Sequence, residues 1–301
     1  MTHPLPTLPL PPNRPRRVAF AGTPNDAVPA LGSLAEAGFD IPVVVTGAPR
    51  RRSRRGHDTP SPVAAAAEQR GLSISHDPAD LAACDADCAV VVAYGRLIGA
   101  DLLSQVPMLN LHFSLLPRWR GAAPVERALL AGDEVTGVCL MALEETLDTG
   151  PVYWRHEVPI SSTDTAASLR SRLSHEGAER LVTSLNDGLG TAEPQQGEPT
   201  YARKLSRADR EIDWSQPATH IDRQIRVGGA WTMLNGQRFI VRGGTPLSLT
   251  HDAPPGTLQS DAVVTGHGIV RLNVVQPAGR PAAEAQAWLN GARLPSGTRF
   301  G

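Results

Sequence analysis

The chain has 301 residues, of which 41% are hydrophobic, and its 29 basic and 30 acidic side chains leave a net charge near zero. This length is enough for roughly two domains with buried cores, and the charge balance gives no general indication of a polyanionic partner. Lys204 is the only lysine and no Gly-Lys-Ser or Gly-Lys-Thr occurs, which excludes a P-loop NTPase. The other 28 basic residues are arginines, and we attribute most of this bias to a GC-rich genome.

Cysteine content and hydropathy indicate the cellular location of the protein. The three cysteines are too few for a disulfide framework and lack the spacing of a zinc or redox motif, so we expect a reducing, cytoplasmic location. No stretch reaches the roughly 20 apolar residues that a membrane span needs. Residues 1–15 hold six prolines, and we expect a disordered extension there; a start codon placed too early explains them equally well.

From residue 16 onward, short apolar runs alternate with helical stretches. Strands are predicted at residues 18–21, 42–46, 72–75, 89–94, 108–113, 137–143 and 153–158. Helices are predicted at residues 27–35, 62–70 and 124–131 and between 164 and 188, and Gly71 suits a left-handed cap after the second of them. This alternation predicts a Rossmann-like, doubly wound α/β domain over residues 16–189.

The remainder of the chain has a different character. Glycine and proline recur in residues 190–208, which we interpret as a linker. Beyond it, one helix is predicted at residues 218–226, and the rest consists of short β-type runs such as 238–241 and 269–275. We therefore expect residues 209–301 to form a small, OB-like β-barrel domain.

Several common motifs are absent. Gly22 stands alone where a dinucleotide fingerprint needs three glycines, which argues against an NAD enzyme. Ser114 lacks the Gly-x-Ser-x-Gly context of a nucleophile elbow, so we interpret it as a loop serine. The nine histidines show no metal-binding spacing, and we expect no protein-bound metal.

One polar constellation remains. Asn110 and His112 share a face near the carboxyl end of a predicted strand, where open α/β sheets bind ligands, and Asp148 follows on a glycine-bearing loop. These groups supply an oxyanion stabiliser, a proton carrier and a base, and none is a good nucleophile. The trio favours direct acyl transfer to an amine. On spacing alone, however, such an Asn and His are more often hydrogen-bonded polar groups of the core.

Residues 110–124, NLHFSLLPRWRGAAP, together with LDTG at 147–150, resemble the signature of folate-dependent formyltransferases. Resemblance to the methionyl-tRNA formyltransferase subfamily extends over nearly the whole chain, through VAFAGTP, PSPV, VVVAYG, YARKLSRADREIDWS, QPAGR and LNGAR. It implies formyl transfer from 10-formyltetrahydrofolate to the α-amino group of initiator methionyl-tRNA for translation initiation, by direct amine attack. It also implies a monomer whose C-terminal barrel binds tRNA.

The resemblance assigns roles to individual residues. Asn110, His112 and Asp148 match the family's catalytic residues. Residues matching its folate-contacting segments are Val92, Tyr94, Gly95, Ser114, Leu115, Leu116 and Pro117. Five arginines match an insertion that contacts the tRNA acceptor stem: Arg50, Arg51, Arg52, Arg54 and Arg55. Without the resemblance, such a charge run is more often a solvated face.

Two segments depart from the family pattern. In residues 46–56, Thr-Gly-Ala-Pro stands where the family usually has Thr-Gln-Pro-Asp. In residues 228–232, Gly-Gly-Ala-Trp stands where the family usually has Asn-Pro-Trp-Pro. The arginine run is assigned to tRNA as a whole, and individual contacts within these two segments are not assigned. Three alternatives compete: a formyltransferase for a nucleotide sugar or another small amine, a tRNA-binding protein without catalysis, and a formylfolate hydrolase. An intact trio disfavours the second, and the arginine loop disfavours the first.

Overall fold

The structure is a computed structural model that describes residues 8–51 and 57–301. These residues divide into two compact units. The first runs to residue 124 and adds 135–159 and 170–202; the second comprises 125–134, 160–169 and 203–301. Each unit is described below by itself.

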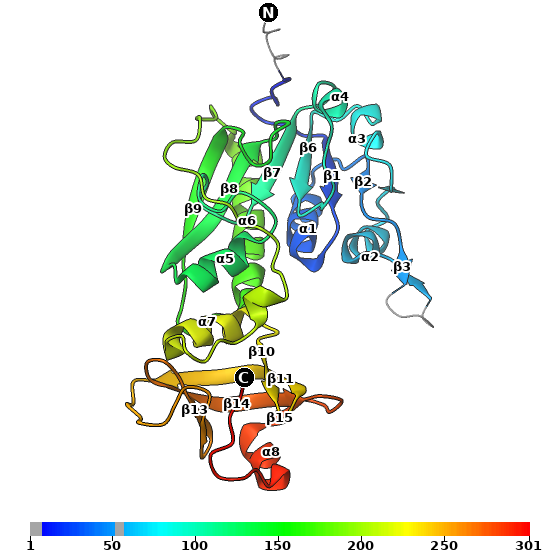
Figure 1. The fold of residues 1–301 in the computed structure, drawn as a ribbon. Coiled ribbons are helices and arrows are strands. Elements are labelled where there is room, and N and C mark those ends of the chain that lie inside the picture. Colours follow the sequence, from blue (N-terminus) through cyan, green and yellow to red (C-terminus); the bar gives the residue numbers. More distant parts are fainter. Residues whose placement is uncertain (1–7, 52–56) are drawn as a thin grey trace, which may run out of the picture. The chain divides into compact units, whose positions relative to one another are not determined.

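The first unit is built on a seven-stranded mixed sheet with the order β5-β2-β1-β6-β7-β8-β9 (Figure 1). Its strands are β1 (Val18–Gly22), β2 (Val44–Val45), β5 (Ile74–Ser75), β6 (Cys88–Val92), β7 (Met108–His112), β8 (Val135–Ala142) and β9 (Val152–Pro159). The strands from β5 to β7 pair in parallel, whereas β8 and β9 are antiparallel. The predicted Rossmann-like domain is confirmed, with an antiparallel edge.

Helices lie on both faces of this sheet. They are α1 (Val28–Glu36), α2 (Pro62–Gln69), α3 (Asp80–Ala83), α4 (Ala100–Leu103) and α6 (Ala166–Asp187). On one face, Leu81 of α3 and Leu103 of α4 join a core with Met108 of β7. On the other, Gly177 of α6 lies so close to Leu111 and Val138 that an added Cβ would be within about 3.2 Å of both side chains. Close packing there fixes the position of β7.

Residues 8–16 are held against the first unit, which differs from the disorder that we expected for residues 1–15. Asn13 accepts hydrogen bonds from the backbone of Leu189 and Gly190, each at 2.9 Å, and Arg14 Nε donates to the carbonyl of Asp187 at 3.1 Å. The predicted linker is likewise engaged, because its Glu193 pairs with Val152 and its Tyr201 with Arg120. Both terminal segments of the predicted domain therefore follow its surface.

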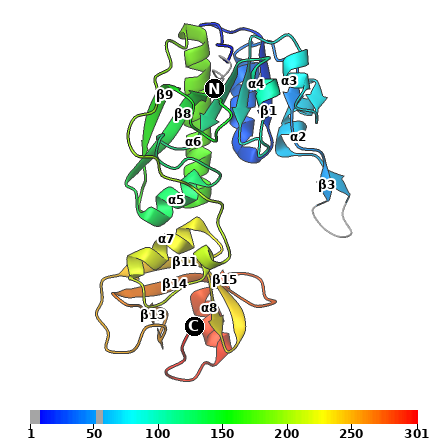
Figure 2. The ribbon, with the colours of Figure 1, turned by 45° about the horizontal axis from the view of Figure 1, so that its top comes forward.

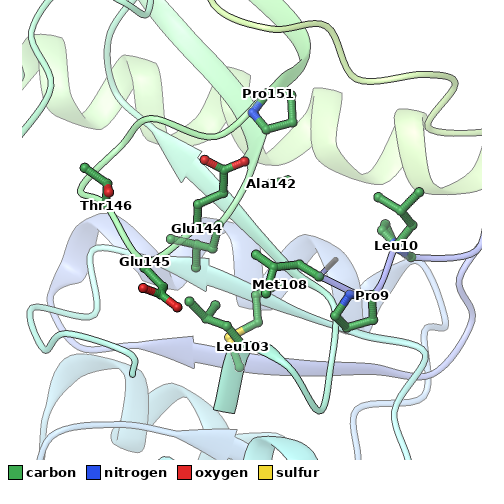
Figure 3. Close-up of a pocket in the computed structure, with 12 residues that line it drawn as sticks. Pro9, Leu10, Leu103, Met108, Ala142, Glu144, Glu145, Thr146 and Pro151 are labelled. Atoms are coloured by element: carbon green, nitrogen blue, oxygen red, sulfur yellow. The ribbon is translucent and has the colours of Figure 1, made fainter. Parts of the chain in front are cut away.

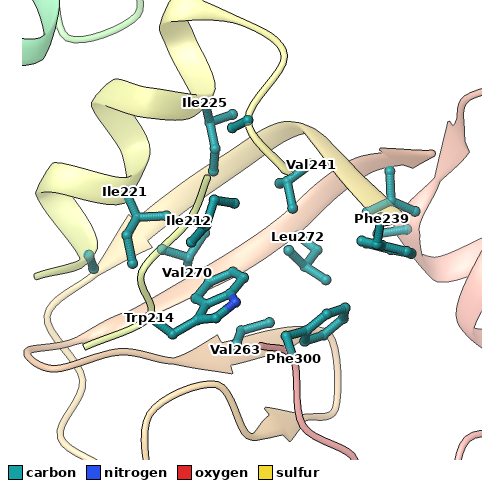
Figure 4. Packing of buried hydrophobic residues seen from close by; sticks show 14 residues of the cluster. Ile212, Trp214, Ile221, Ile225, Phe239, Val241, Val263, Val270, Leu272 and Phe300 are labelled. Atoms are coloured by element: carbon teal, nitrogen blue, oxygen red, sulfur yellow. The ribbon is translucent and has the colours of Figure 1, made fainter. Parts of the chain in front are cut away.

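The second unit has a six-stranded sheet with the order β10-β11-β14-β13-β12, and β15 pairs with β14. Its strands are β10 (Trp231–Leu234), β11 (Gln237–Leu247), β12 (Leu258–Gln259), β13 (Ala262–Val264), β14 (Ile269–Pro277) and β15 (Ala283–Glu284). All of these pairs are antiparallel. Helix α7 (Ala218–Val227) covers a core that includes Trp214, Phe239 and Phe300 (Figure 4). Helix α8 (Ala285–Ala292), labelled in Figure 2, was not predicted.

The end of the chain links the two edge strands of this sheet. Phe300 N donates to Gly256 O and Leu258 N to Thr298 O, each at 2.8 Å, while Gly301 N donates to Met233 O at 3.0 Å. Residues 298–301 thus bond to β10 on one side and to the β12 region on the other. We call these four residues the closing segment, because they complete a barrel-like circuit of antiparallel strands.

Candidate functional site

Asn110 and His112 lie on β7, as their alternation with Leu109 and Leu111 predicts. The strand is central: Val91 of β6 pairs with Asn110 on one side, and Met141 of β8 pairs with it on the other. Because side chains alternate along a strand, Asn110 and His112 point to the same face as Met108. His112 is buried and Asn110 is half-buried.

Asp148 reaches this face from the loop between β8 and β9. Its backbone is left-handed, with φ +53°, and Gly121 N donates to its Oδ2 at 2.7 Å. Gly150 is required two residues later, because an added Cβ would lie 1.9 Å from the carbonyl oxygen of Ala142. The LDTG sequence therefore forms a tight turn that holds the carboxylate in place.

The structure brings the predicted catalytic trio together. Asn110 Nδ2 lies 3.5 Å from Asp148 Oδ1, and His112 Nδ1 lies 3.7 Å from Asp148 Oδ2. His112 Nε2 is 3.0 Å from the carbonyl oxygen of Trp119. A carbonyl only accepts, so Nε2 carries hydrogen there and Nδ1 is the ring nitrogen that faces the carboxylate. The side chains of His112 and Asp148 are 7% and 6% exposed, which limits screening by water.

Gln195 is a supporting residue that the sequence did not reveal. Its Nε2 donates to the carbonyl oxygens of Asp148 and Gly150, each at 2.9 Å, and its Oε1 accepts from Arg120 Nε and Nη2 at 3.1 and 2.7 Å. It lies in the predicted linker, far along the chain from the loop that it holds. No spacing rule connects the two, so only the fold shows this contact.

The loop predicted to contact folate is firmly fixed. Ser114 is fully buried and donates to Arg118 O at 2.6 Å, and Leu116 belongs to a small core cluster. The carbonyl of Leu116 accepts from Arg155 Nε at 3.1 Å, and that of Pro117 accepts from Thr200 N at 3.2 Å. Leu116 therefore serves the core, and its predicted cofactor contact stays a prediction, as do those of Ser114, Leu115 and Pro117.

The second predicted cofactor segment follows β6. Val92 and Tyr94 are buried, and Gly95 has a left-handed backbone with φ +76°. Thr23 Oγ1 donates to the carbonyl of Tyr94 at 3.1 Å, which ties this turn to the one after β1. Among the residues that the structure describes, the Tyr94 hydroxyl has no hydrogen-bond partner. Contacts of Val92, Tyr94 and Gly95 with a cofactor stay predictions.

A pocket of about 440 Å³ opens at Met108 of β7 (Figure 3). Its lining residues are Leu8, Pro9, Leu10, Pro11, Leu103, Met108, Ala142, Leu143, Glu144, Glu145, Thr146 and Pro151. Met108 is two residues from Asn110 on the same face of β7, and Thr146 and Pro151 flank the Asp148 turn. The sequence did not predict this pocket, and none of the predicted cofactor-binding residues is among those lining it.

The arginine run behaves differently from the trio. Arg50 and Arg51 form β3 (Arg50–Arg51), which pairs with β4 (Asp58–Thr59), so this segment is a short hairpin rather than a plain loop. Arg51 Nε lies 3.4 Å from Asp58 Oδ1, with both side chains more than 60% exposed. Arg52, Arg54 and Arg55 lie outside the described residues. In the sheet, β1 and β6 separate β2 from β7.

Within residues 8–51 and 57–301, no group of three or more His, Cys, Asp or Glu side chains is arranged to hold a metal ion. None of the helices in this part of the chain is both long and apolar enough to cross a bilayer.

Comparison with known proteins covers both units. The Formyl transferase family matches residues 16–185, and the Formyl transferase C-terminal domain family matches residues 204–293. Two relatives described as methionyl-tRNA formyltransferases, from Jannaschia sp. and Roseobacter denitrificans, are each 42% identical over 94% of this chain and cover 99% and 98% of their own lengths. An N-formyltransferase structure from Helicobacter canadensis, complexed with folinic acid and dTDP-3-aminofucose, is 16% identical. It covers 85% of this chain and 98% of its own, with a TM-score of 0.64, and shows the fold alone.

Proposed function

The chain belongs to the formyltransferase family, and from this premise we propose that it transfers the formyl group of 10-formyltetrahydrofolate to the α-amino group of initiator methionyl-tRNA. The observation that carries the proposal is the convergence of Asn110, His112 and Asp148 on one face of β7 within the matched domain. Relatives described as methionyl-tRNA formyltransferases match this chain over nearly their whole length, which supports tRNA as the acceptor.

The trio suits direct attack by the amine. The neutral α-amine attacks the formyl carbon, and the oxygen of that carbon gains negative charge. Asn110 Nδ2 is held only at 3.5 Å from Asp148, so it is free to donate a stronger hydrogen bond to this oxygen. None of the three side chains is a good nucleophile, and no covalent enzyme intermediate is needed.

Proton balance assigns the remaining roles. The amine loses one proton as its bond to carbon forms, and N10 of the folate takes up one proton as its bond to carbon breaks. Asp148 is placed to accept the first, directly or through water, and Gly121 N already fixes one of its oxygens. His112 Nδ1 lies beside Asp148, so it can take up the proton that Asp148 accepts and pass it to N10, which returns both side chains to their starting states.

We assign the pteridine ring of the donor to the pocket beside β7. Its walls are mostly apolar, and the carboxylates of Glu144 and Glu145 can accept hydrogen bonds from the ring's amino group. One methylene group joins N10 to the ring. Met108 and Asn110 are about 7 Å apart along the strand, so a ring over Met108 brings the formyl group to the trio.

The acceptor arm of the tRNA is assigned to the arginine hairpin and to the antiparallel domain. Arg50 and Arg51 are exposed, as phosphate contacts require. We further propose that the protein acts as a cytoplasmic monomer, which sedimentation of the purified full chain tests. A stable dimer at micromolar concentration would refute this part alone.

The decisive assay supplies 10-formyltetrahydrofolate with initiator methionyl-tRNA, elongator methionyl-tRNA or a UDP-amino sugar, and follows the N-formyl product. We expect product on the initiator tRNA only. Product on the amino sugar would indicate the small-amine alternative. Tetrahydrofolate release without any formylated acceptor would indicate a hydrolase.

A further inference from the structure

The proline-rich segment before β1 lies at the donor pocket. Leu8, Pro9, Leu10 and Pro11 line that pocket, opposite the turn that carries Glu145 and Thr146 (Figure 3). The segment is anchored directly behind these residues, by Asn13 and Arg14 on residues 187–190 and by Arg16 N on Asp87 Oδ2 at 2.7 Å. The anchors fix where residues 8–11 lie.

The two leucines of the segment differ in environment. Leu8 packs against the core cluster that contains Leu103 and Met108, so it attaches the segment to the floor of the pocket. Leu10 also lines the pocket, but it is 76% exposed. An exposed leucine at the edge of an apolar pocket gains stabilisation when an apolar ligand covers it.

The segment forms a wall and does not fill the pocket. About 440 Å³ remain with residues 8–11 in place, within the range of small-molecule sites. Pro9, Pro11 and Pro12 restrict the backbone, so little conformational entropy is lost when a ligand binds against it. The family match begins at residue 16, after this segment, so the wall is an addition to the family domain.

We propose that residues 8–11, which we call the N-terminal wall, bind the donor's pteridine ring against Met108 and so position the formyl group at Asn110. Leu10 contributes the main contact. This inference rests on the proposed function, because it takes the occupant to be the folate donor.

The test compares the full chain with chains lacking residues 1–7 or 1–11, and with the variant Leu10→Ala. Leu249→Ala is the matched control, since Leu249 is 56% exposed and lies in the second unit. The readouts are the Kd of folinic acid, a stable folate probe, and the KM values of 10-formyltetrahydrofolate and initiator tRNA. Thermal unfolding checks that each chain is folded.

We expect loss of residues 1–11 to raise the folinic acid Kd and the donor KM at least about tenfold, and Leu10→Ala to raise both about threefold. The KM of the tRNA should not change. Loss of residues 1–7 and Leu249→Ala should leave the folinic acid Kd and the donor KM as in the full chain, and Leu10→Met should restore most of the affinity.

An unchanged Kd in folded Leu10→Ala and in the chain lacking residues 1–11 would overturn the N-terminal wall. A lower Kd would also overturn it, because the segment would then act as a plug. A full chain that binds folinic acid but formylates no initiator tRNA would refute the proposed acceptor, while the Kd comparison would still decide the role of the wall. A full chain that binds no folinic acid would overturn both proposals.

Discussion

The proposed catalytic trio (Asn110, His112 and Asp148) and the proposed tRNA-binding arginine hairpin differ in burial and in how they are held. His112 and Asp148 are almost fully buried, and neighbouring backbone groups fix each side chain to within hydrogen-bond distances. Arg51 and Asp58, by contrast, are 69% and 61% exposed and lie 3.4 Å apart. The described charges of the hairpin are therefore largely exposed to solvent.

This contrast teaches that acyl transfer and polyanion binding need different precision. Stabilising a developing oxyanion requires donors that are already in position, because reorganising them during reaction costs free energy. Phosphate binding gains from counterion release, which depends on the number of cations more than on their exact placement. Single substitutions should therefore be severe at the trio and mild at the hairpin.

The largest effect is expected from Asp148→Asn. The amide keeps the shape of the side chain but cannot accept the amine proton, so kcat should fall about 10³-fold or more, in the range of losses for general bases. Formylation kinetics measure this, and the Kd of folinic acid should stay within about twofold. If Asp148→Asn unfolds the protein, the residue is structural and the contrast with the hairpin disappears.

Asn110→Ala should follow. Loss of one oxyanion donor costs roughly 3 to 4 kcal/mol of transition-state stabilisation, or about 10² to 10³ in kcat. Leu109 is the matched control position, because it lies on the opposite face of β7, and Leu109→Val should retain most of the activity in a folded protein. Wild-type turnover of Asn110→Ala would show that the amide has no role in the chemistry.

Substitutions in the arginine hairpin should have a smaller effect on formylation than those in the trio. Replacing Arg51, Arg52 and Arg54 by alanine should raise the KM of the tRNA roughly tenfold and reduce the slope of log Kd against log salt by about one for each phosphate that is no longer neutralised. Folinic acid affinity should not change. Arg70→Ala, at an ion pair with Glu36 in the first unit and outside both segments assigned to tRNA, is the control. An unchanged salt slope would show that the hairpin arginines form only a solvent-exposed charged surface and do not contact tRNA.

The smallest effect concerns stability and compares two ion pairs. Arg127 donates to both oxygens of Asp209, at 2.7 and 3.1 Å, and with Ser206 it holds the pKa of that carboxyl well below its usual range. A depressed pKa stabilises the fold above the ordinary value of about 3.9, and this stabilisation is lost as pH falls through the lower folded-state value. Asp209→Asn should lower the Tm at pH 7 by a few degrees.

The Tm difference between wild type and Asp209→Asn should shrink as the pH is lowered from 5 towards 2. Asp58→Asn, at the exposed pair with Arg51, should shift the Tm little at any pH because exposed pairs contribute about 0 to 1 kcal/mol. A Tm difference for Asp209→Asn that does not depend on pH would show that its charge is not what stabilises the fold.

The sequence predicted most elements because local patterns determine them. Alternation placed Asn110 and His112 on one face of β7, and Gly71, with φ +68°, ends α2 as expected. The pocket beside β7 was missed because four separated segments build it, and no local pattern connects Leu10 with Met108 or Thr146. Gln195 was missed for the same reason: its partners lie 45 and 47 residues away.

Contacts between distant residues also explain two differences from what composition predicts. The proline content of residues 1–15 predicts disorder, yet polar contacts of Asn13 and Arg14 order the part that the structure describes. Helix α8 was missed because glycine and proline around it favour turns, while its packing is tertiary: Trp288 lies 4.7 Å from Phe239, centroid to centroid. Contacts between distant residues decide such cases, and composition does not report them.

The closing segment has a consequence for synthesis. Residues 298–301 bond both to Met233 and to the Gly256 region, so the circuit of strands closes only after these residues have left the ribosome. Until then, β10 and β12 each expose an unpaired edge, which is a template for association with other chains. A bulky group placed directly after residue 301 would act on this step, so it should lower the yield of correctly folded protein.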